Sequence, residues 1–155
     1  GAVTLSEEMA LTQNYLGIMQ RRFKNAFKVS VEIEPEALEC LIPRFSLQPL
    51  VENALLHGLM HCDKPDKRLT VRAWREGGCV LIEIEDSGSG MPEETRIQLE
   101  TREAGRDEGY GVANVRKRLM LFGGAEASFK VASREGAGTC VSIALPARFG
   151  GETDQ

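Results

Sequence analysis

The chain has 155 residues and an apolar fraction of 42%, which suits one globular domain with a full core and excludes extensive disorder. No apolar run approaches the roughly 20 residues that a membrane-spanning helix needs, and the start does not resemble a signal peptide, so we expect this part of the protein to be soluble. The net charge of −4, without a block of Lys and Arg, argues against a nucleic-acid-binding surface.

The chain is expected to open with a helix and a strand. Thr4 and Glu7 have the spacing of a capping box, and apolar residues then recur at helical intervals as far as Phe23. This pattern predicts a helix over residues 4–25. Alternating apolar residues predict a strand over residues 29–33.

A second helix is expected to begin near Ser46. Pro49 is tolerated in its first turn, where no intrahelical N–H bond is lost. Asn53 and His57 are four residues apart and therefore lie on one face, beside an apolar stripe that reaches Gly58. These two polar side chains are the first candidate site residues.

The second half of the chain alternates strands, a long connection and a helix. Two strands are predicted over residues 69–75 and 79–85, and a last strand over 139–145. A third helix is expected over residues 111–122. Residues 92–108 are polar and long for a connection inside a compact domain, which is typical of a functional lid.

These elements predict a two-layer α/β (α+β) sandwich, in which a mixed sheet carries helices on one face. We expect a single domain over residues 1–155, with its core over about 5–146. The tail that follows has no pattern and is expected to fray.

Asp86 is the most informative polar residue. It continues the inward parity of Ile82 and Ile84, and a buried carboxylate is costly unless it accepts hydrogen bonds. It opens an Asp-Ser-Gly-Ser-Gly string in which Gly88 and Gly90 permit a sharp turn and the close approach of a ligand. The alternative is an ordinary turn capped by an Asp side chain.

Further candidate site residues lie at the start of a helix, on a helix and at the start of a strand. Gly109 and Gly111 open a helix whose free N–H groups can cradle phosphate, although a flexible hinge is the alternative. The amide oxygen of Asn53 is a suitable Mg²⁺ ligand, with a polar helix edge as the alternative. Thr139 places a hydroxyl on the inward face at the start of the last strand.

A zinc site formed by His57, His61, Cys62 and Asp63 is an alternative, because histidines four apart share a helix face. A helix exit is the more economical interpretation, since the cysteines are scattered and form no C-x-x-C pair. We expect them to be reduced thiols in a cytosolic protein.

The motifs in this order resemble the Bergerat (GHKL) nucleotide-binding fold of gyrase, the MutL repair proteins, heat-shock chaperones and histidine kinases. The string from Gln48 to Gly58 resembles the N box of LytS/YehU-like sensor histidine kinases, and the segments 15–23 and 111–119 resemble the same subfamily. The resemblance covers residues 5–146.

The resemblance implies a Mg-ATP site. Asn53 would hold Mg²⁺ and His57 would lie near the phosphates, as the catalytic pair, while Asp86 would accept a hydrogen bond from the adenine amino group. Thr139 would support Asp86. Other contacts to the nucleotide would come from Gly88, Gly90, Met91, Gly109, Gly111, Val112 and Asn114.

Three residues depart from the family pattern. Leu56 replaces a frequent Lys, which removes a charge near the phosphates, and Val112 replaces the usual Leu. Pro49 stands where gyrase-like enzymes have a catalytic Glu, which argues against ATP hydrolysis of the gyrase type.

The implied function is that of the ATP-binding catalytic domain of a two-component sensor histidine kinase. It would transfer the γ-phosphoryl group to a histidine on an upstream dimerisation helix absent from this chain, and the group would pass to a response regulator. The parent would be a membrane-anchored homodimer with this domain in the cytoplasm. Two alternatives stay open: a non-catalytic nucleotide-sensing module, which the absence of a Lys at Leu56 keeps open, and an anti-sigma-type serine kinase, which the N box disfavours.

Overall fold

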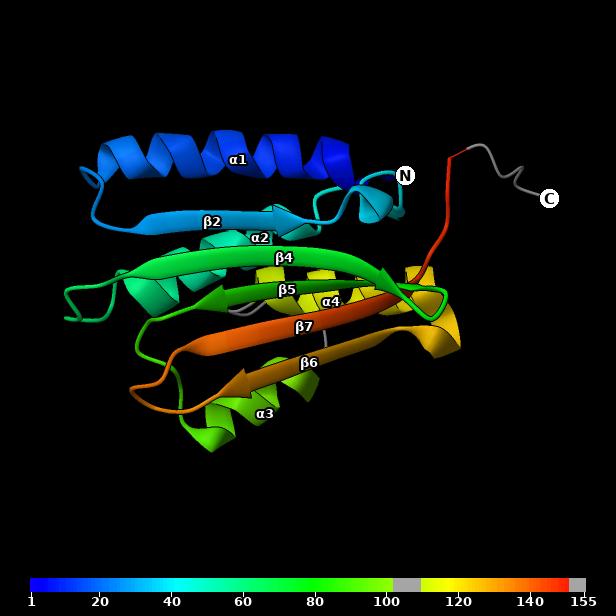
Figure 1. Cartoon of the computed structure of the whole chain (residues 1–155). Coiled ribbons are helices and arrows are strands. Elements are labelled where there is room, and N and C mark those ends of the chain that lie inside the picture. Colours follow the sequence, from blue (N-terminus) through cyan, green and yellow to red (C-terminus); the bar gives the residue numbers. More distant parts are fainter. Residues whose placement is uncertain (102–109, 151–155) are drawn as a thin grey trace.

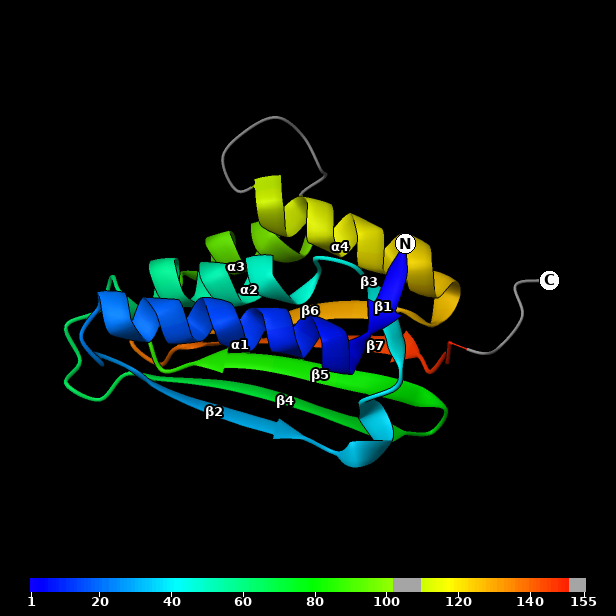
Figure 2. The ribbon, with the colours of Figure 1, turned by 90° about the horizontal axis from the view of Figure 1, so that it is seen from above.

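The computed structural model describes residues 1–101 and 110–150. A five-stranded sheet forms one layer, and all four α-helices lie on one of its faces (Figures 1 and 2). The predicted two-layer sandwich with a mixed sheet is therefore confirmed. In spatial order the strands are β2 (Lys28–Ile33), β4 (Arg68–Glu76), β5 (Cys79–Asp86), β7 (Thr139–Pro146) and β6 (Ser128–Ser133).

The helices differ in length and regularity. They are α1 (Leu5–Arg22), α2 (Leu47–Asn53), α3 (Glu93–Thr101) and α4 (Tyr110–Gly123). Helix α2 continues directly into the π-helix η2 (Ala54–Leu59), and two 3₁₀ turns, η1 (Pro35–Ala37) and η3 (Gly124–Glu126), lie in connections. A separate two-stranded sheet pairs β1 (Ala2–Thr4) with β3 (Leu41–Pro43).

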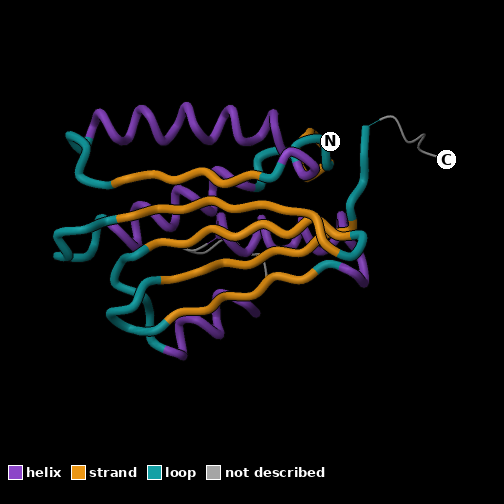
Figure 3. Tube along the Cα trace, in the orientation of Figure 1, coloured by secondary structure: helices purple, strands orange, loops and turns teal. Residues whose placement is uncertain are grey.

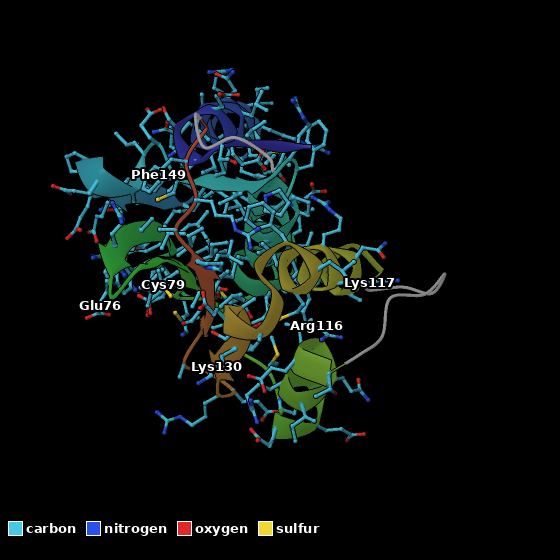
Figure 4. All side chains as sticks on the ribbon, turned by 90° about the vertical axis from the view of Figure 1, so that its right-hand side faces the viewer. Glu76, Cys79, Arg116, Lys117, Lys130 and Phe149 are labelled. Atoms are coloured by element: carbon cyan, nitrogen blue, oxygen red, sulfur yellow. The ribbon has the colours of Figure 1, made fainter. Side chains whose placement is uncertain are left out.

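The sheet has one apolar and one polar face. Alternate residues of β4 and β5, such as Val71 and Ile84, are buried beneath the helices. On the opposite face Arg72 forms ion pairs with Glu83 and Glu85, and Lys130 also points away from the helices (Figure 4). Strand parity therefore decides that Asp86, two residues after Ile84, points toward the helices.

Register brings the polar strand ends together. Strand β2 pairs with β4 in parallel and all other pairs in this sheet are antiparallel. Asp86 at the end of β5 lies opposite Thr139 at the start of β7, and Leu69 is its partner on the other side. The predicted site residues of these strands therefore meet at one end of the sheet.

A buried carboxylate from α1 fixes the start of α2. The Glu8 side chain is 1% exposed, and its two oxygens accept hydrogen bonds from the backbone N–H groups of Phe45 and Leu47, both at 3.1 Å. Ser46, which precedes α2, donates its hydroxyl hydrogen to the carbonyl of Pro43 instead of capping the helix. Glu8 therefore satisfies N–H groups at the start of α2 and complements the positive end of its dipole.

The structure differs from the sequence expectations in three places. The first helix ends at Arg22, before Asn25, because Lys24 and Asn25 turn into the left-handed region with φ of 54° and 58°. The expected lid over residues 92–108 contains helix α3, which was not anticipated. The short strands β1 and β3 were also missed. Residues 102–108 of the expected lid lie outside the described part.

The four cysteines are all free thiols. Within residues 1–101 and 110–150, no helix has the length and apolar character required to cross a membrane.

We predict that Glu8→Gln destabilises the fold. The amide cannot present two charged acceptors to the two N–H groups, and a hydrogen bond to a charged group contributes about 1.5–3 kcal/mol. Urea unfolding should therefore show a loss of about that size in the free energy of unfolding. Glu7→Gln, at the exposed neighbouring position, is the control; equal effects of the two substitutions would contradict the capping role.

Candidate functional site

The candidate site is a cavity between the helical layer and the sheet, at the end where β5 stops and β7 begins. Its walls come from α2 and η2, the ends of β5 and β7, α3 and the start of α4. Seven of the predicted nucleotide residues line it: Asn53, His57, Asp86, Gly90, Met91, Val112 and Thr139. The helix, the strands and the loops thus bring these separate motifs to one place.

The other predicted site residues have different positions. Gly88 lies beside the cavity, where its N–H donates to Asp86. Gly111 and Asn114 belong to the first turns of α4 but are not among the residues that line the cavity. Gly109 lies outside the described residues.

Asp86 is buried with only part of its hydrogen-bonding capacity used. Its side chain is 4% exposed, and Oδ1 accepts a hydrogen bond of 2.8 Å from the Gly88 N–H. No donor from the described residues reaches Oδ2. Burial raises the pKa of Asp86 to about 6, although the Gly88 N–H and the Lys64 charge act in the opposite direction. A carboxylate with a spare acceptor therefore lines the cavity.

Glycines allow neighbouring segments to pack closely against Asp86. A Cβ at Gly58 would lie 2.6 Å from Oδ1 of Asp86, so a larger residue in η2 would collide with the carboxylate. A Cβ at Gly138, where φ is +82°, would overlap the Asp86 carbonyl. Sequence reasoning placed Gly58 only in the apolar stripe, because its close approach to Asp86 is visible only in three dimensions.

Ser133, the last residue of β6, connects this strand to the start of β7, and sequence reasoning did not single it out. Its hydroxyl shares a hydrogen bond of 2.8 Å with the Thr139 hydroxyl and accepts one of 3.0 Å from the Met91 N–H. It also donates to the Gly138 carbonyl. Thr139 thus acts within a hydroxyl network that holds Met91 at the cavity.

Helix α3 covers one side of the cavity. Its Leu99 is a lining residue. The Glu100 carboxylate accepts a 2.6 Å hydrogen bond from the Val131 N–H, and Arg96 donates to the Val131 carbonyl at 3.1 Å. Arg96 and Glu100 also pair with each other at 2.9 Å. The two side chains therefore attach α3 to the backbone of β6.

Asn53 fits the expected magnesium ligand better than the histidines fit a zinc site. Its half-buried amide lines the cavity and forms no hydrogen bond with any described residue, which leaves an oxygen of the kind that Mg²⁺ prefers. The rings of His57 and His61 are parallel, with their centroids 6.0 Å apart. The Cys62 thiol donates a hydrogen bond to the Leu59 carbonyl. Among the described residues, no three His, Cys, Asp or Glu side chains gather into a metal-binding cluster.

Comparison with protein families accounts for this arrangement. Residues 43–148 match the model of the histidine kinase-, DNA gyrase B-, and HSP90-like ATPases. The chain belongs to this family. The matched segment contains every predicted site residue, from Asn53 to Thr139.

Curated relatives are sensor kinases. The chain is 36% identical to the sensor histidine kinase YesM of Bacillus subtilis, over 94% of this chain and 24% of the relative. It is 34% identical to the sensor protein LytS of Bacillus anthracis, over 97% of this chain and 26% of the relative. The chain therefore spans about a quarter of the length of these relatives.

Solved structures support the fold. The catalytic domain of the histidine kinase ThkA superimposes with a TM-score of 0.71 at 16% identity, covering 95% of each chain. The mycobacterial sensor histidine kinase MprB superimposes with a TM-score of 0.67 at 21% identity, covering 97% of this chain and 99% of the other. At these identities the likeness concerns the fold alone.

We predict that Asp86→Asn stabilises the ligand-free domain at neutral pH. Because the folded-state pKa of about 6 exceeds the ordinary value of 3.8, folding favours the protonated acid. The stability contributed by Asp86 is therefore fully present below about pH 4 and is lost as the pH rises through 6. The unfolding free energy gained by the substitution, relative to wild type, should increase by about 2 kcal/mol between pH 4.5 and 7.5.

Urea unfolding of both proteins across this pH range checks the prediction. Asp63→Asn, which changes an exposed carboxylate, serves as the control and should show no comparable gain with pH. A constant difference between wild type and Asp86→Asn at all pH values would mean that the Asp86 carboxylate is not desolvated in the folded domain.

Proposed function

We propose that this chain is the ATP-binding catalytic domain of a sensor histidine kinase. It binds Mg-ATP in the cavity described above and supports transfer of the γ-phosphoryl group to a histidine elsewhere in a longer protein. The observation that carries the proposal is Asp86, a buried carboxylate in the cavity that Asn53 also lines; one of its oxygens accepts no hydrogen bond from residues 1–101 or 110–150.

The environment of Asp86 suits adenine. An ionised carboxylate only accepts hydrogen bonds; the adenine amino group donates one, whereas the guanine oxygen at the same position is another acceptor. Apolar side chains of Ile84, Met91 and Val141 line the same cavity and can contact the faces of a base. The site therefore combines one polar specificity group with apolar walls.

The phosphate end of the site is proposed to lie toward Asn53 and α4. The Asn53 oxygen would hold Mg²⁺, which would neutralise charge on the phosphate oxygens. Helix α4 begins at Tyr110, close in sequence to the cavity-lining Val112, and its free N–H groups favour anions. His57, exposed at the cavity, is proposed to contact the phosphates, as is Asn114 on α4.

The cavity favours phosphoryl transfer over gyrase-type hydrolysis. Among its described lining residues, Asp86 is the only carboxylate, and its proposed partner is the base. Pro49 in the first turn of α2 offers no group to activate water. The acceptor histidine is therefore proposed to lie on an upstream dimerisation helix of a homodimeric, membrane-anchored parent, from which the phosphoryl group passes to a response regulator.

A non-catalytic nucleotide-sensing module is the second candidate. Leu56, half-buried beside His57, removes a positive charge that many relatives of this subfamily are expected to carry near the phosphates. Nucleotide binding without phosphoryl transfer would favour this candidate, so binding and transfer need separate measurements.

We predict that the domain prefers ATP to GTP by about tenfold to a hundredfold, because a hydrogen bond to a charged group contributes about 1.5–3 kcal/mol. Asp86→Ala should weaken ATP binding by a similar factor and leave GTP binding nearly unchanged. Competition calorimetry with both nucleotides measures the preference, with Asp63→Ala as the control. Equal affinities of wild type for ATP and GTP would exclude Asp86 as the reader of the base.

We also predict that nucleotide binding depends on Mg²⁺ through Asn53. Asn53→Ala should weaken ADP binding in Mg²⁺ to about the affinity that wild type shows with a chelator, since the substitution removes the oxygen ligand. Gln48→Ala, elsewhere on α2, is the control because Gln48 is not among the cavity-lining residues. An unchanged response of Asn53→Ala to the chelator would contradict the metal role.

The transfer step requires a longer protein that includes the upstream helix. Labelled γ-phosphate should be incorporated there in an acid-labile form, and Asn53→Ala should abolish this label. The 155-residue chain alone should remain unlabelled, because His57 and His61 both belong to the region of the nucleotide site. Acid-stable label in the longer protein would instead indicate a serine kinase.

A further inference from the structure

Lys64 lies close to the nucleotide site but does not contact the cavity. It follows η2 in the connection to β4, and it is not among the residues that line the cavity. Its ammonium group donates hydrogen bonds to three backbone carbonyls: Ser87 at 3.1 Å, Gly88 at 3.0 Å and Gly136 at 2.6 Å. A lysine ammonium has three N–H donors, so each can be matched to one of these carbonyls.

These carbonyls belong to two turns at the same end of the sheet, one after β5 and one between β6 and β7. Figure 3 shows the loops at this end next to the connection that carries Lys64. The Gly136 N–H donates to the Ser89 carbonyl at 2.7 Å, which joins the two turns directly. The ammonium group therefore binds across a junction that the backbone has already formed.

One peptide group connects Lys64 to Asp86. The carbonyl of Ser87 accepts from Lys64, and the N–H of the same peptide unit, which belongs to Gly88, donates to Oδ1 of Asp86 at 2.8 Å. The peptide unit is planar, and in its trans form the C=O and N–H point in opposite directions. Because Lys64 holds the Ser87 carbonyl, it also determines the direction in which the Gly88 N–H points, toward Asp86.

Gly88 itself does not fix the orientation of this peptide. Gly88 has no side chain to restrict its backbone, and both orientations of the preceding peptide are accessible to glycine. A rotated peptide would aim its carbonyl oxygen at the Asp86 carboxylate and withdraw the N–H. The side chain of Ser87 does not prevent this rotation, because its hydroxyl is engaged with the Arg68 N–H on the other side of the turn.

We propose that Lys64 is a positioning residue for base recognition, which holds the Ser87–Gly88 peptide in the orientation that presents Asp86 to adenine. The inference rests on the proposed nucleotide site and extends it to a residue outside the cavity. Lys64 does not touch the base; it acts through one peptide and one carboxylate. Its positive charge also favours the ionised, hydrogen-bond-accepting form of Asp86.

The test compares ADP and GDP affinities of the 155-residue chain by calorimetry in Mg²⁺. Lys64→Met keeps the aliphatic stem and removes the three donors; ADP binding should weaken about tenfold while GDP binding changes by less than about twofold. The matched control is Lys67→Met, which removes the same charge three residues away. The Lys67 side chain forms no hydrogen bond or ion pair with any described residue, so its loss should leave both affinities within about twofold of wild type.

A double-mutant cycle shows whether Lys64 acts through Asp86. In the Asp86→Asn background, Lys64→Met should change the ratio of ADP to GDP affinity by less than about twofold, because the carboxylate that Lys64 orients is gone. An undiminished effect in that background would overturn the proposed route. A merely structural Lys64 would lower the melting temperature and leave the ratio unchanged in the wild-type background, which would also overturn the proposal.

A second variant covers the case in which Lys64→Met fails to fold, and the wild-type affinities separate failure of the proposed function from failure of the Lys64 role. If Lys64→Met does not fold, Lys64→Gln retains two N–H donors and should give a folded protein with a smaller loss of adenine preference; a folded variant with the full preference contradicts the inference. If wild type binds neither nucleotide, the proposed function itself fails. If wild type prefers ADP and the Lys64 variants share that preference, only the role of Lys64 fails.

Discussion

The burial of Asp86 is the constraint to which the surrounding structure is fitted. A carboxylate that is 4% exposed and holds one backbone hydrogen bond is unfavourable in a ligand-free domain. Two neighbouring glycines leave space for this residue: Gly58 makes room for the carboxylate, and Gly138 makes room for the backbone of Asp86. Proteins violate local rules of stability where function requires it, and this site has the pattern expected of such a violation.

Glu8 illustrates the opposite solution to the same problem. Both of its oxygens accept backbone N–H groups at the start of α2, so the buried charge is fully used within the fold. The consequence also reaches the site, because α2 and η2 carry Asn53 and His57 to the cavity. One buried carboxylate thus positions the helix, and the other is left with capacity for a ligand.

The sequence predicted helices and strands correctly where apolar and polar residues repeat with a short period. Period-two alternation located the strands that end at Asp86 and begin at Thr139, and helical spacing placed Asn53 and His57 together. The sequence could not reveal the role of Lys64, whose partners are backbone carbonyls 23, 24 and 72 residues away. Every residue has a backbone carbonyl, so no residue type marks these partners in the sequence. Ser133 was missed for the same reason, since its hydroxyl acts across two strands.

Helix α3 was missed because no apolar stripe marks it in the sequence. None of its residues is buried, and it is attached to the sheet by Arg96 and Glu100, which together satisfy both backbone groups of Val131. Strand β6 is an edge strand, and unpaired edge groups favour unwanted strand pairing. The same two side chains thus cover this edge at Val131 and belong to the helix that places Leu99 at the cavity. Because these contacts are polar and part-buried, water can replace them at a modest cost, whereas a helix docked by apolar side chains would have to expose them. Attachment of the cover through polar groups suits the proposed function, in which the site admits and releases a nucleotide.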